Sequence, residues 1–466
     1  MECNNLLRIV IKDYIKPEFF SRVKENTEED KMKYLKEMGF ETNPKGGYIF
    51  YCNRFARFFL RYTDVVLLPN EEELALYNQK KGVYELNAEA KLGKLTKYFM
   101  NAVYDLWNPS FETLALKTIR RDVSKIATAF NTGEYINLQD GMLDLNTFEL
   151  YEHSPDYLST VQLPFKYHSS NLTPVFEKYL DDITCGDTEL KLVIQEMIGY
   201  CLSTSTVAEK AFFLAGSGCN GKSVLAQLIQ RLVGEGNYSN TSLSALNGNF
   251  GLASLVNSNV NIAAENSSGK ICSEIFKAIV SGDTVEANRK YKDALSVKLH
   301  AKLVLLFNTL PESDDLSYGF FRKTMIIPFD RTFTKDEIDV ELIDKLEKEL
   351  SGIFQWALKG LQRLRNNNYV FSKCERCDKE LKKYKFSLNP VAEFVNSYLV
   401  LDCSGSMKRS DIYKTYSTYC YDNSIEILNC QKFWRLFKAH CADVGFAFNT
   451  CKIKGYEYVR GVQYAK

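Results

Sequence analysis

Between residues 211 and 329 the chain alternates short apolar runs with longer amphipathic stretches. The apolar runs have the length and composition of strands that are buried on both faces of a sheet. The stretches between them repeat hydrophobic residues at three- and four-residue intervals, which favours helices. The four runs are 211–215, 260–265, 302–308 and 325–329. This alternation predicts an α/β domain built on a parallel sheet.

The region before this domain has a different pattern. Residues 1–80 mix charged helical patterns with aromatic runs, and they suggest no particular role. Residues 81–172 predict a mostly helical α+β domain, with helices over 91–107 and 110–130. A hairpin follows, because Asp140-Gly141 is a favoured two-residue turn between alternating apolar positions.

We expect the α/β domain to span 173–372, since helical patterns lead into it and amphipathic helices close it. A charged stretch at 372–385 suggests a linker, and the pattern restarts in a last domain over 386–466. That domain predicts three helices and a terminal hairpin, the order of a winged helix. These elements are expected at about 391–400, 408–422, 430–443 and 446–464.

The 466 residues are 45% hydrophobic and 25% charged, a composition typical of soluble globular proteins. No apolar run is long enough to cross a membrane and Met1 begins no signal peptide, so we expect no membrane contact and a cytoplasmic protein. The formal net charge of +1 confines any nucleic-acid binding to local patches. Cys374 and Cys377 form a lone CxxC without a second pair, which argues against a metal site there.

A glycine-rich loop follows the first apolar run and precedes a helical pattern. Glycines in such a loop let successive backbone N–H groups point toward phosphate oxygens, and the helix N-terminus adds partial positive charge. Lys222 is placed to reach the β- and γ-phosphates, and the Ser223 hydroxyl is placed to hold Mg²⁺. The loop consists of Gly216, Ser217, Gly218, Cys219, Asn220, Gly221, Lys222 and Ser223. The full G-x-x-x-x-G-K-S pattern with both flanks correct predicts a nucleoside triphosphate site.

Three later residues stand where catalysis needs polar groups. Glu265 ends the second apolar run, where a carboxylate supports Mg²⁺ or orients the attacking water. Asn308 ends the third run and is placed to sense the γ-phosphate. Arg322 precedes the last run, where a cation from one subunit could reach a neighbour's nucleotide, although a salt bridge within the subunit is nearly as good a reading.

Two basic clusters are candidates for DNA binding. Arg289, Lys290 and Lys292 flank Tyr291, a pattern that suits contact with a nucleic-acid backbone, or alternatively a solvated loop. Lys432 and Arg435 lie on the third helix of the expected winged helix, which commonly enters DNA but also serves protein–protein contacts. Near the N-terminus Arg54, Arg57 and Arg61 share one helix face, which could touch nucleic acid, although such a face is more commonly solvated or salt-bridged.

The order of these motifs resembles that of superfamily 3 helicases, most closely the helicase half of phage, plasmid and poxviral primase–helicases. The resemblance covers about residues 80–466 and is specific over 210–330. It implies an AAA+ P-loop ATPase core with a parallel sheet, preceded by a mostly helical domain and followed by a winged helix. It also implies a ring, in this family a hexamer, that hydrolyses ATP with Mg²⁺ while moving on DNA.

The resemblance assigns roles to single residues. Glu265 would act in the second acidic motif, Asn308 as the first sensor, and Arg322 as a finger supplied in trans. Lys290 and Lys292 would lie on a pore hairpin that grips DNA. The family commonly has an acidic pair where Ala264-Glu265 stands here, so Glu265 would combine two tasks.

We therefore expect an ATP-dependent replicative DNA helicase of a phage or mobile element, working in the cytoplasm of a bacterial host. The chain has no recognisable primase domain, so a separate primase or other replication proteins would be partners. Two alternatives stay open: an ATP-switched origin-binding initiator that does not unwind processively, and a scaffold with a vestigial ATPase. Unwinding of a forked substrate separates the first from the helicase, and measurable turnover excludes the second.

Overall fold

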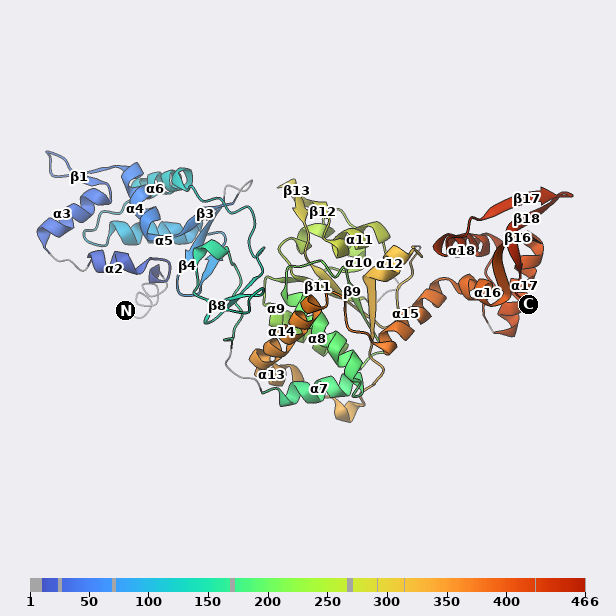
Figure 1. The fold of residues 1–466 in the computed structure, drawn as a ribbon. Helices are drawn as coiled ribbons and strands as arrows, with labels where there is room; N and C mark the ends of the chain where they lie inside the picture. The colour runs from blue at the N-terminus through green and yellow to red at the C-terminus, as the bar shows by residue number, and fades with distance from the viewer. Residues whose placement is uncertain are drawn as a thin grey trace.

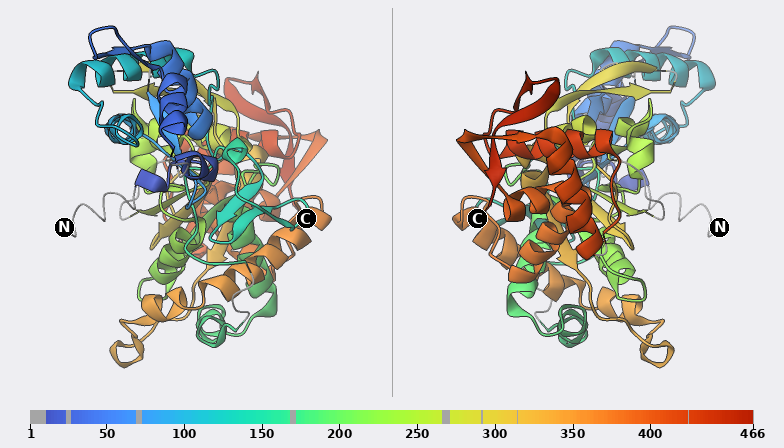
Figure 2. Two further views of the ribbon diagram at one scale, coloured as in Figure 1. Left: turned by 90° about the vertical axis from the view of Figure 1, so that its left-hand side faces the viewer. Right: turned by 90° about the vertical axis from the view of Figure 1, so that its right-hand side faces the viewer.

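The computed structural model describes residues 11–23, 27–68, 73–167, 172–265, 271–290, 292–313, 315–423 and 425–465. Figure 1 shows them as three parts side by side, coloured from blue through green and yellow to red, and Figure 2 views this row from its two ends. Among these residues no helix is long and apolar enough to cross a membrane.

A five-stranded sheet forms the centre of the molecule. Its strands lie in the order β10, β11, β14, β9 and β15, and every neighbouring pair is parallel. The strands are β9 (Ala211–Ala215), β10 (Tyr238–Ser239), β11 (Val260–Glu265), β14 (Lys302–Phe307) and β15 (Thr324–Pro328). The four expected apolar runs are thus four adjacent strands, which confirms the predicted α/β core with its parallel sheet.

Helices cover both faces of this sheet, because alternate side chains of each strand point to opposite faces. In β9, Phe212 and Leu214 pack into a core with α7, α8, α9 and α14, whereas Ala211 and Phe213 pack with α11 and α12 on the other face. These helices are α7 (Pro174–Thr184), α8 (Thr188–Leu202), α9 (Lys222–Val233), α11 (Ser273–Ser281), α12 (Tyr318–Lys323) and α14 (Leu350–Asn366). The shorter elements of this part are α10 (Leu243–Leu246), a hairpin of β12 (Thr284–Arg289) and β13 (Lys292–Lys298), and α13 (Leu342–Glu347).

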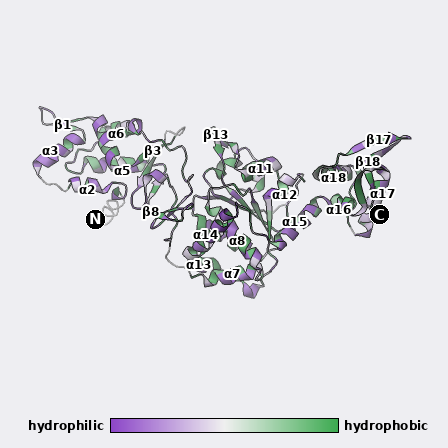
Figure 3. Ribbon diagram, viewed as in Figure 1, coloured by the Kyte–Doolittle hydropathy of each residue, from purple (hydrophilic) through white to green (hydrophobic). Residues whose placement is uncertain are grey.

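The N-terminal part has an aromatic-rich core of its own. One cluster of buried side chains runs from Tyr14 to Val123, so it joins residues on both sides of the expected boundary at position 80. Its exposed helix α3 is largely hydrophilic (Figure 3). The elements are α2 (Pro17–Val23), α3 (Glu28–Glu37), β1 (Phe40–Thr42), β2 (Tyr48–Phe50), α4 (Cys52–Tyr62), β3 (Val65–Leu67), β4 (Leu74–Asn78), β5 (Val83–Glu85), α5 (Glu89–Met100), α6 (Pro109–Asp122), β6 (Tyr135–Leu138), β7 (Gly141–Asp144) and β8 (Leu150–Tyr151).

In this part the expected hairpin is confirmed, since β6 and β7 pair antiparallel, but its turn is Gln139-Asp140 and not Asp140-Gly141, because Gly141 is already paired with Leu138. Both expected helices are shorter than predicted. The first, α5, ends at Met100, where the Asn101 side chain accepts a hydrogen bond from the Trp107 amide instead of continuing the helix. The second, α6, ends at Asp122 because Val123 takes an extended conformation.

The C-terminal part contains three helices and a three-stranded antiparallel sheet in the order β16, β18, β17. Its core belongs to the same buried cluster as one face of the central sheet, and includes Phe394, Tyr416, Phe433 and Val459. Its elements are α16 (Pro390–Tyr398), β16 (Leu399–Lys408), α17 (Arg409–Asp422), α18 (Cys430–Asp443), β17 (Asn449–Ile453) and β18 (Tyr456–Tyr464). The three helices and the terminal hairpin were expected, whereas β16 was not.

The expected linker at 372–385 is wrong, because this stretch contains most of a helix, α15 (Glu375–Leu388). Acidic residues in its first turn and Lys385 in its last complement the helix dipole. Cys377 and Tyr384 are buried, and the Tyr384 hydroxyl donates a 2.7 Å hydrogen bond to the Pro311 carbonyl. A charged segment is therefore helical here because its few apolar residues fall on one buried side.

One buried lysine predicts a pH dependence of stability. Burial lowers the pKa of Lys302, at the start of β14, to about 8, and its amine donates to the Ser203 carbonyl. Between about pH 8 and the ordinary value of 10.5 the unfolded chain holds this proton while the folded chain has lost it. The free energy of unfolding contributed by Lys302 therefore rises with pH through this window.

We expect the free energy of unfolding of Lys302→Met to exceed that of the wild type most at pH 7, and we expect this difference to disappear by pH 10. Urea unfolding at several pH values measures the difference, and the exposed Lys298→Met is the matched control. A difference in unfolding free energy that does not change with pH would contradict this assignment.

Candidate nucleotide-binding site

The glycine-rich loop joins β9 to α9 in the way its sequence predicts. Gly218 and Gly221 have φ angles of 109° and 84°, which side chains rarely adopt. A Cβ atom on Gly216 would lie 2.5 Å from the Phe329 carbonyl oxygen, so only glycine fits where the loop passes the end of β15. Asn220 holds the loop to the same carbonyl through a 3.2 Å hydrogen bond from its side-chain amide.

Lys222 is the first residue of α9, and its side chain turns back beneath the loop. Its amine donates to the Gly216 carbonyl at 2.6 Å, to Asn220 Oδ1 at 2.9 Å and to Asn308 Oδ1 at 3.4 Å. These three partners are all neutral, and burial lowers the pKa of the amine. A buried cation that has no carboxylate partner among the described residues is suited to bind an anion such as a phosphate.

Strand register brings the expected catalytic positions to one edge of the sheet. Ala215, before the loop, is paired with Phe307, and Phe307 is paired with Glu265 on its other side. Asn308 and Glu265 therefore leave the sheet beside the loop, at the carboxyl ends where parallel sheets bind ligands. The side chain of Glu265 lies outside the described part of the structure.

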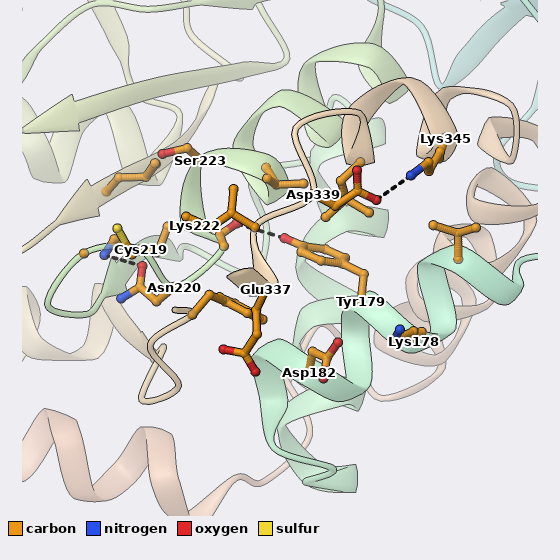
Figure 4. Close-up of a pocket in the computed structure, with 18 of the residues that line it drawn as sticks. Lys178, Tyr179, Asp182, Cys219, Asn220, Lys222, Ser223, Glu337, Asp339 and Lys345 are labelled. Carbon is orange, nitrogen blue, oxygen red and sulfur yellow. Dashed lines mark hydrogen bonds and ion pairs between the residues drawn. The ribbon is translucent and has the colours of Figure 1, made fainter. Parts of the chain in front are cut away.

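A cavity of about 730 Å³ opens next to the loop (Figure 4). The loop residues from Gly218 to Ser223 line it together with Asn308, and residues of α7 and of the segment 333–345 complete it. In Figure 4 Tyr179 points from α7 toward the loop, where its hydroxyl donates a 3.0 Å hydrogen bond to the Gly221 carbonyl. The residues of this second wall form no motif and lie far along the chain from the loop, so the sequence did not indicate it.

Arg331 ties the two sides of the second wall together. Its guanidinium pairs with Asp182 of α7 and, at 3.1 Å, with Glu337, and it stacks 4.7 Å from the ring centre of Phe333. The Phe333 amide also donates to the Cys219 carbonyl at 2.7 Å, which fastens this segment to the loop. Asp182, Phe333 and Glu337 all line the cavity, so Arg331 shapes it from outside.

Arg322, on α12, is not among the residues that line this cavity. Its guanidinium lies 2.5 Å from Glu209 of the same chain, and the side chain is 46% exposed. The neighbouring Lys323 is buried and pairs with the same carboxylate at 3.1 Å. The intrasubunit salt bridge considered from the sequence is therefore present, although it leaves about half of Arg322 accessible.

The basic clusters expected to bind DNA lie away from the cavity. Arg289 and Lys292 close the β12–β13 hairpin as cross-strand partners, with Lys290 exposed in its turn. The side chains of Arg289 and Lys292, and Tyr291 as a whole, lie outside the described residues. On α18, Lys432 and Arg435 are exposed, whereas Trp434 between them is buried.

Cys374 and Cys377 are both buried free thiols at the start of α15. Within the described parts of the chain, no group of three metal-ligating side chains occurs there or elsewhere.

Two family models match the chain. Residues 48–185 match the family described as D5 N terminal like, and residues 214–322 match DUF5906, a family of unknown function. The second match contains the loop, Glu265, Asn308 and Arg322.

The chain is also similar to curated and solved proteins. It is 24% identical over 299 residues to "Putative helicase L207/L206" of Acanthamoeba polyphaga mimivirus, which covers 57% of the chain and 30% of that protein. It is 28% identical over 124 residues to the uncharacterized mitochondrial protein ymf21 of Marchantia polymorpha, covering 24% of the chain and 69% of that protein. The chain thus spans less than a third of the mimivirus protein.

Among solved structures, two of the C-terminal region of NrS-1 share the fold, with TM-scores of 0.50 and 0.51 and 13% identity. They cover 85% and 86% of this chain, and 95% and 96% of their own chains. The two family models and the mimivirus relative support the resemblance to phage and viral primase–helicases that the motifs indicate, and the solved structures share the fold.

Proposed function

We propose that this chain is an ATP-dependent replicative DNA helicase of a phage or related mobile element, and that it moves on single-stranded DNA as a hexameric ring. The observation that carries the proposal is the buried Lys222 amine, held by neutral oxygens at the wall of a 730 Å³ cavity. Lys222 would bind the phosphates, Ser223 and Glu265 would hold Mg²⁺, and Asn308 would sense the γ-phosphate. Bound ATP and Mg²⁺ would supply the phosphoryl group and the metal charge.

The arrangement of the central strands supports an AAA+ assignment within this proposal. The loop-bearing strand β9 lies between β15 and β14, and β14 separates it from β11, which ends in Glu265. Glu265, as the proposed water-positioning carboxylate, and Asn308, as the proposed sensor, then stand at the ends of two neighbouring strands on one side of the loop. The three helices and terminal hairpin of the C-terminal part support a winged helix, with Lys432 and Arg435 as its DNA-contacting cations. We also propose that 173–372 and 386–466 act as separate regions, whereas 1–80 and 81–172 are joined by the aromatic core that crosses position 80.

The experiment that tests the function is ATP hydrolysis with and without single-stranded DNA, together with strand separation on a forked duplex. DNA-stimulated hydrolysis with unwinding is expected. Hydrolysis without unwinding would favour the origin-binding initiator, and the absence of both activities would favour the scaffold. The Lys222→Ala chain, purified in the same way, is the control that measures any hydrolysis by contaminating enzymes.

Arg322→Ala is expected to abolish hydrolysis, and mixing it with Lys222→Ala subunits is expected to restore part of it. Some interfaces of a mixed ring would combine an intact Lys222 from one subunit with an intact Arg322 from its neighbour. Glu209→Gln is the matched control, because it breaks the ion pair of Arg322 and leaves the arginine in place. Absence of rescue, or an equal loss in Glu209→Gln, would count against a finger acting in trans.

Arg331→Ala is expected to raise KM for ATP about tenfold while kcat changes much less, the pattern for a group that shapes binding without touching the reaction. Arg331→Lys should recover only part of this, because an ammonium group cannot pair with both carboxylates and stack on Phe333. Steady-state kinetics measure both constants. A fall in kcat at unchanged KM would contradict this role.

A further inference from the structure

A second hollow lies in the N-terminal part, between α3 and α4, and its walls are cationic. It encloses about 470 Å³ and is lined by Lys33 and Lys36 of α3 and by three arginines of α4. The arginines are Arg54, Arg57 and Arg61, which follow one another along a single helix face. We call this hollow the basic groove.

Few carboxylates neutralise the basic groove. Glu37 also lines it, but it pairs with Arg22 at 3.1 Å. Arg54 lies 2.5 Å from Glu41. Among the described residues, no ion pair is found for Lys33, Lys36, Arg57 or Arg61, and all four are exposed. Cations that face one another across two helices repel unless an anion lies between them, so the groove is built to receive negative charge.

We propose that the basic groove binds the phosphodiester backbone of a nucleic acid, at a site separate from the nucleotide cavity and from the β12–β13 hairpin. Three guanidinium groups in a row suit phosphate oxygens, which they can contact in a bidentate way. Its one apolar lining residue, Phe58, is 3% exposed, so the groove offers no pocket for the apolar anchors that a protein partner needs.

The margin of the groove carries an aromatic side chain that suits the same ligand. Tyr51 is 39% exposed, and the Arg54 guanidinium lies 4.7 Å from its ring centre. An exposed ring beside a row of cations is the combination that binds single strands, with bases stacking on the ring and phosphates meeting the cations. We therefore infer a preference for single-stranded over duplex nucleic acid.

The test measures binding of the full chain to a fluorescein-labelled 30-nucleotide DNA strand by anisotropy, without nucleotide and over a range of salt concentrations. Arg57→Glu/Arg61→Glu is compared with Lys94→Glu/Lys117→Glu, which changes the net charge equally at exposed lysines outside the groove. We expect at least tenfold weaker binding for the groove variant. The slope of the logarithm of the binding constant against the logarithm of salt concentration should also be smaller in magnitude by about 1.4, since each of the two lost phosphate contacts removes about 0.7. The control should bind within about twofold of the wild type.

Equal weakening of both variants would overturn the proposal, because it would reduce the effect to net charge. Unchanged binding by the groove variant would overturn it as well. So would a groove-dependent affinity for poly-glutamate that exceeds the affinity for DNA, since this would indicate an acidic protein partner. Should charge reversal unfold the chain, Arg57→Gln/Arg61→Gln replaces it, with an expected loss of at least threefold.

A second measurement locates the bound strand. DNA containing 5-iodouracil is photo-crosslinked to the full chain, and crosslinked peptides are identified by mass spectrometry. Crosslinks at Tyr51 that disappear in the groove variant are expected, whereas crosslinks confined to other parts of the chain would overturn the proposal. Because both measurements omit ATP, the same results are expected in the Lys222→Ala chain, so this proposal and the proposed ATPase function can fail separately.

Discussion

Replacing Lys222 with alanine is expected to lower the rate of ATP hydrolysis on the order of 10³-fold. The amine is buried between the Gly216 carbonyl and the side chains of Asn220 and Asn308, so the charge is already held where phosphates would lie. A side chain fixed in this way loses little entropy when it binds, and alanine removes its positive charge from the transferring phosphoryl group. Single-turnover hydrolysis measures the effect on the chemical step.

Lys345→Ala is the matched control, because Lys345 lines the same cavity at its other end. Its side chain is 42% exposed, and its amine pairs with Asp339 at 2.6 Å, away from the loop (Figure 4). We expect it to change KM at most severalfold and to leave kcat almost unaltered. Comparable losses of kcat in the two variants, or hydrolysis that survives in Lys222→Ala, would show that the loop is not the catalytic site.

The second large effect is expected on stability, from adding one methyl group between α8 and α14. A Cβ atom on Gly360 would lie 2.3 Å from the Gln195 carbonyl oxygen, and one on Gly199 would lie 2.4 Å from that of Ala357. Both obstacles are backbone, which cannot move aside as a flexible side chain would. Gly360→Ala gains about 1 kcal/mol of helix propensity, but the overpacking costs up to about 3 kcal/mol or more, so a net loss of about 2 kcal/mol is expected.

Gly319→Ala makes the same substitution in α12, where the nearest atom would be 3.6 Å away. It should be neutral or slightly stabilising, so urea titrations are expected to show a lower free energy of unfolding for Gly360→Ala only. The double variant Gly199→Ala/Gly360→Ala should lose less than the sum of the single losses, because one separation of the helices relieves both contacts. A Gly360→Ala chain as stable as Gly319→Ala would refute this account of the helix contact.

The nucleotide side of the candidate site was largely predictable from local sequence. Gly216 to Ser223 need a strand before them and a helix after them, and all three features lie within about twenty residues. Glu265 and Asn308 were identified from their positions at the ends of apolar runs, because strands of a parallel sheet end together. The other wall could not be found in this way. Tyr179 and Arg331 lie on opposite sides of the loop in the chain and belong to no recognisable spacing.

Electrostatic context was equally hidden. The sequence placed Arg54, Arg57 and Arg61 on one helix face and favoured a solvated or salt-bridged role for them. Only the packing of α3 against α4 shows that Lys33 and Lys36 face the same groove. Arg322, by contrast, has a carboxylate partner, Glu209, that no helical spacing could indicate.

By itself the sequence determined the α/β class, the glycine-rich loop between a strand and a helix, and the candidate positions at the strand ends, because each depends on periodicity or on residues close together in the chain. Tertiary structure alone decided the strand order, the second wall of the cavity, the basic groove and the helical state of α15. These depend on contacts between segments far apart in sequence, where burial and charge are set by the neighbour that packing supplies. A charged stretch such as 375–388 looks like a linker until Cys377 and Tyr384 find a buried surface to pack against.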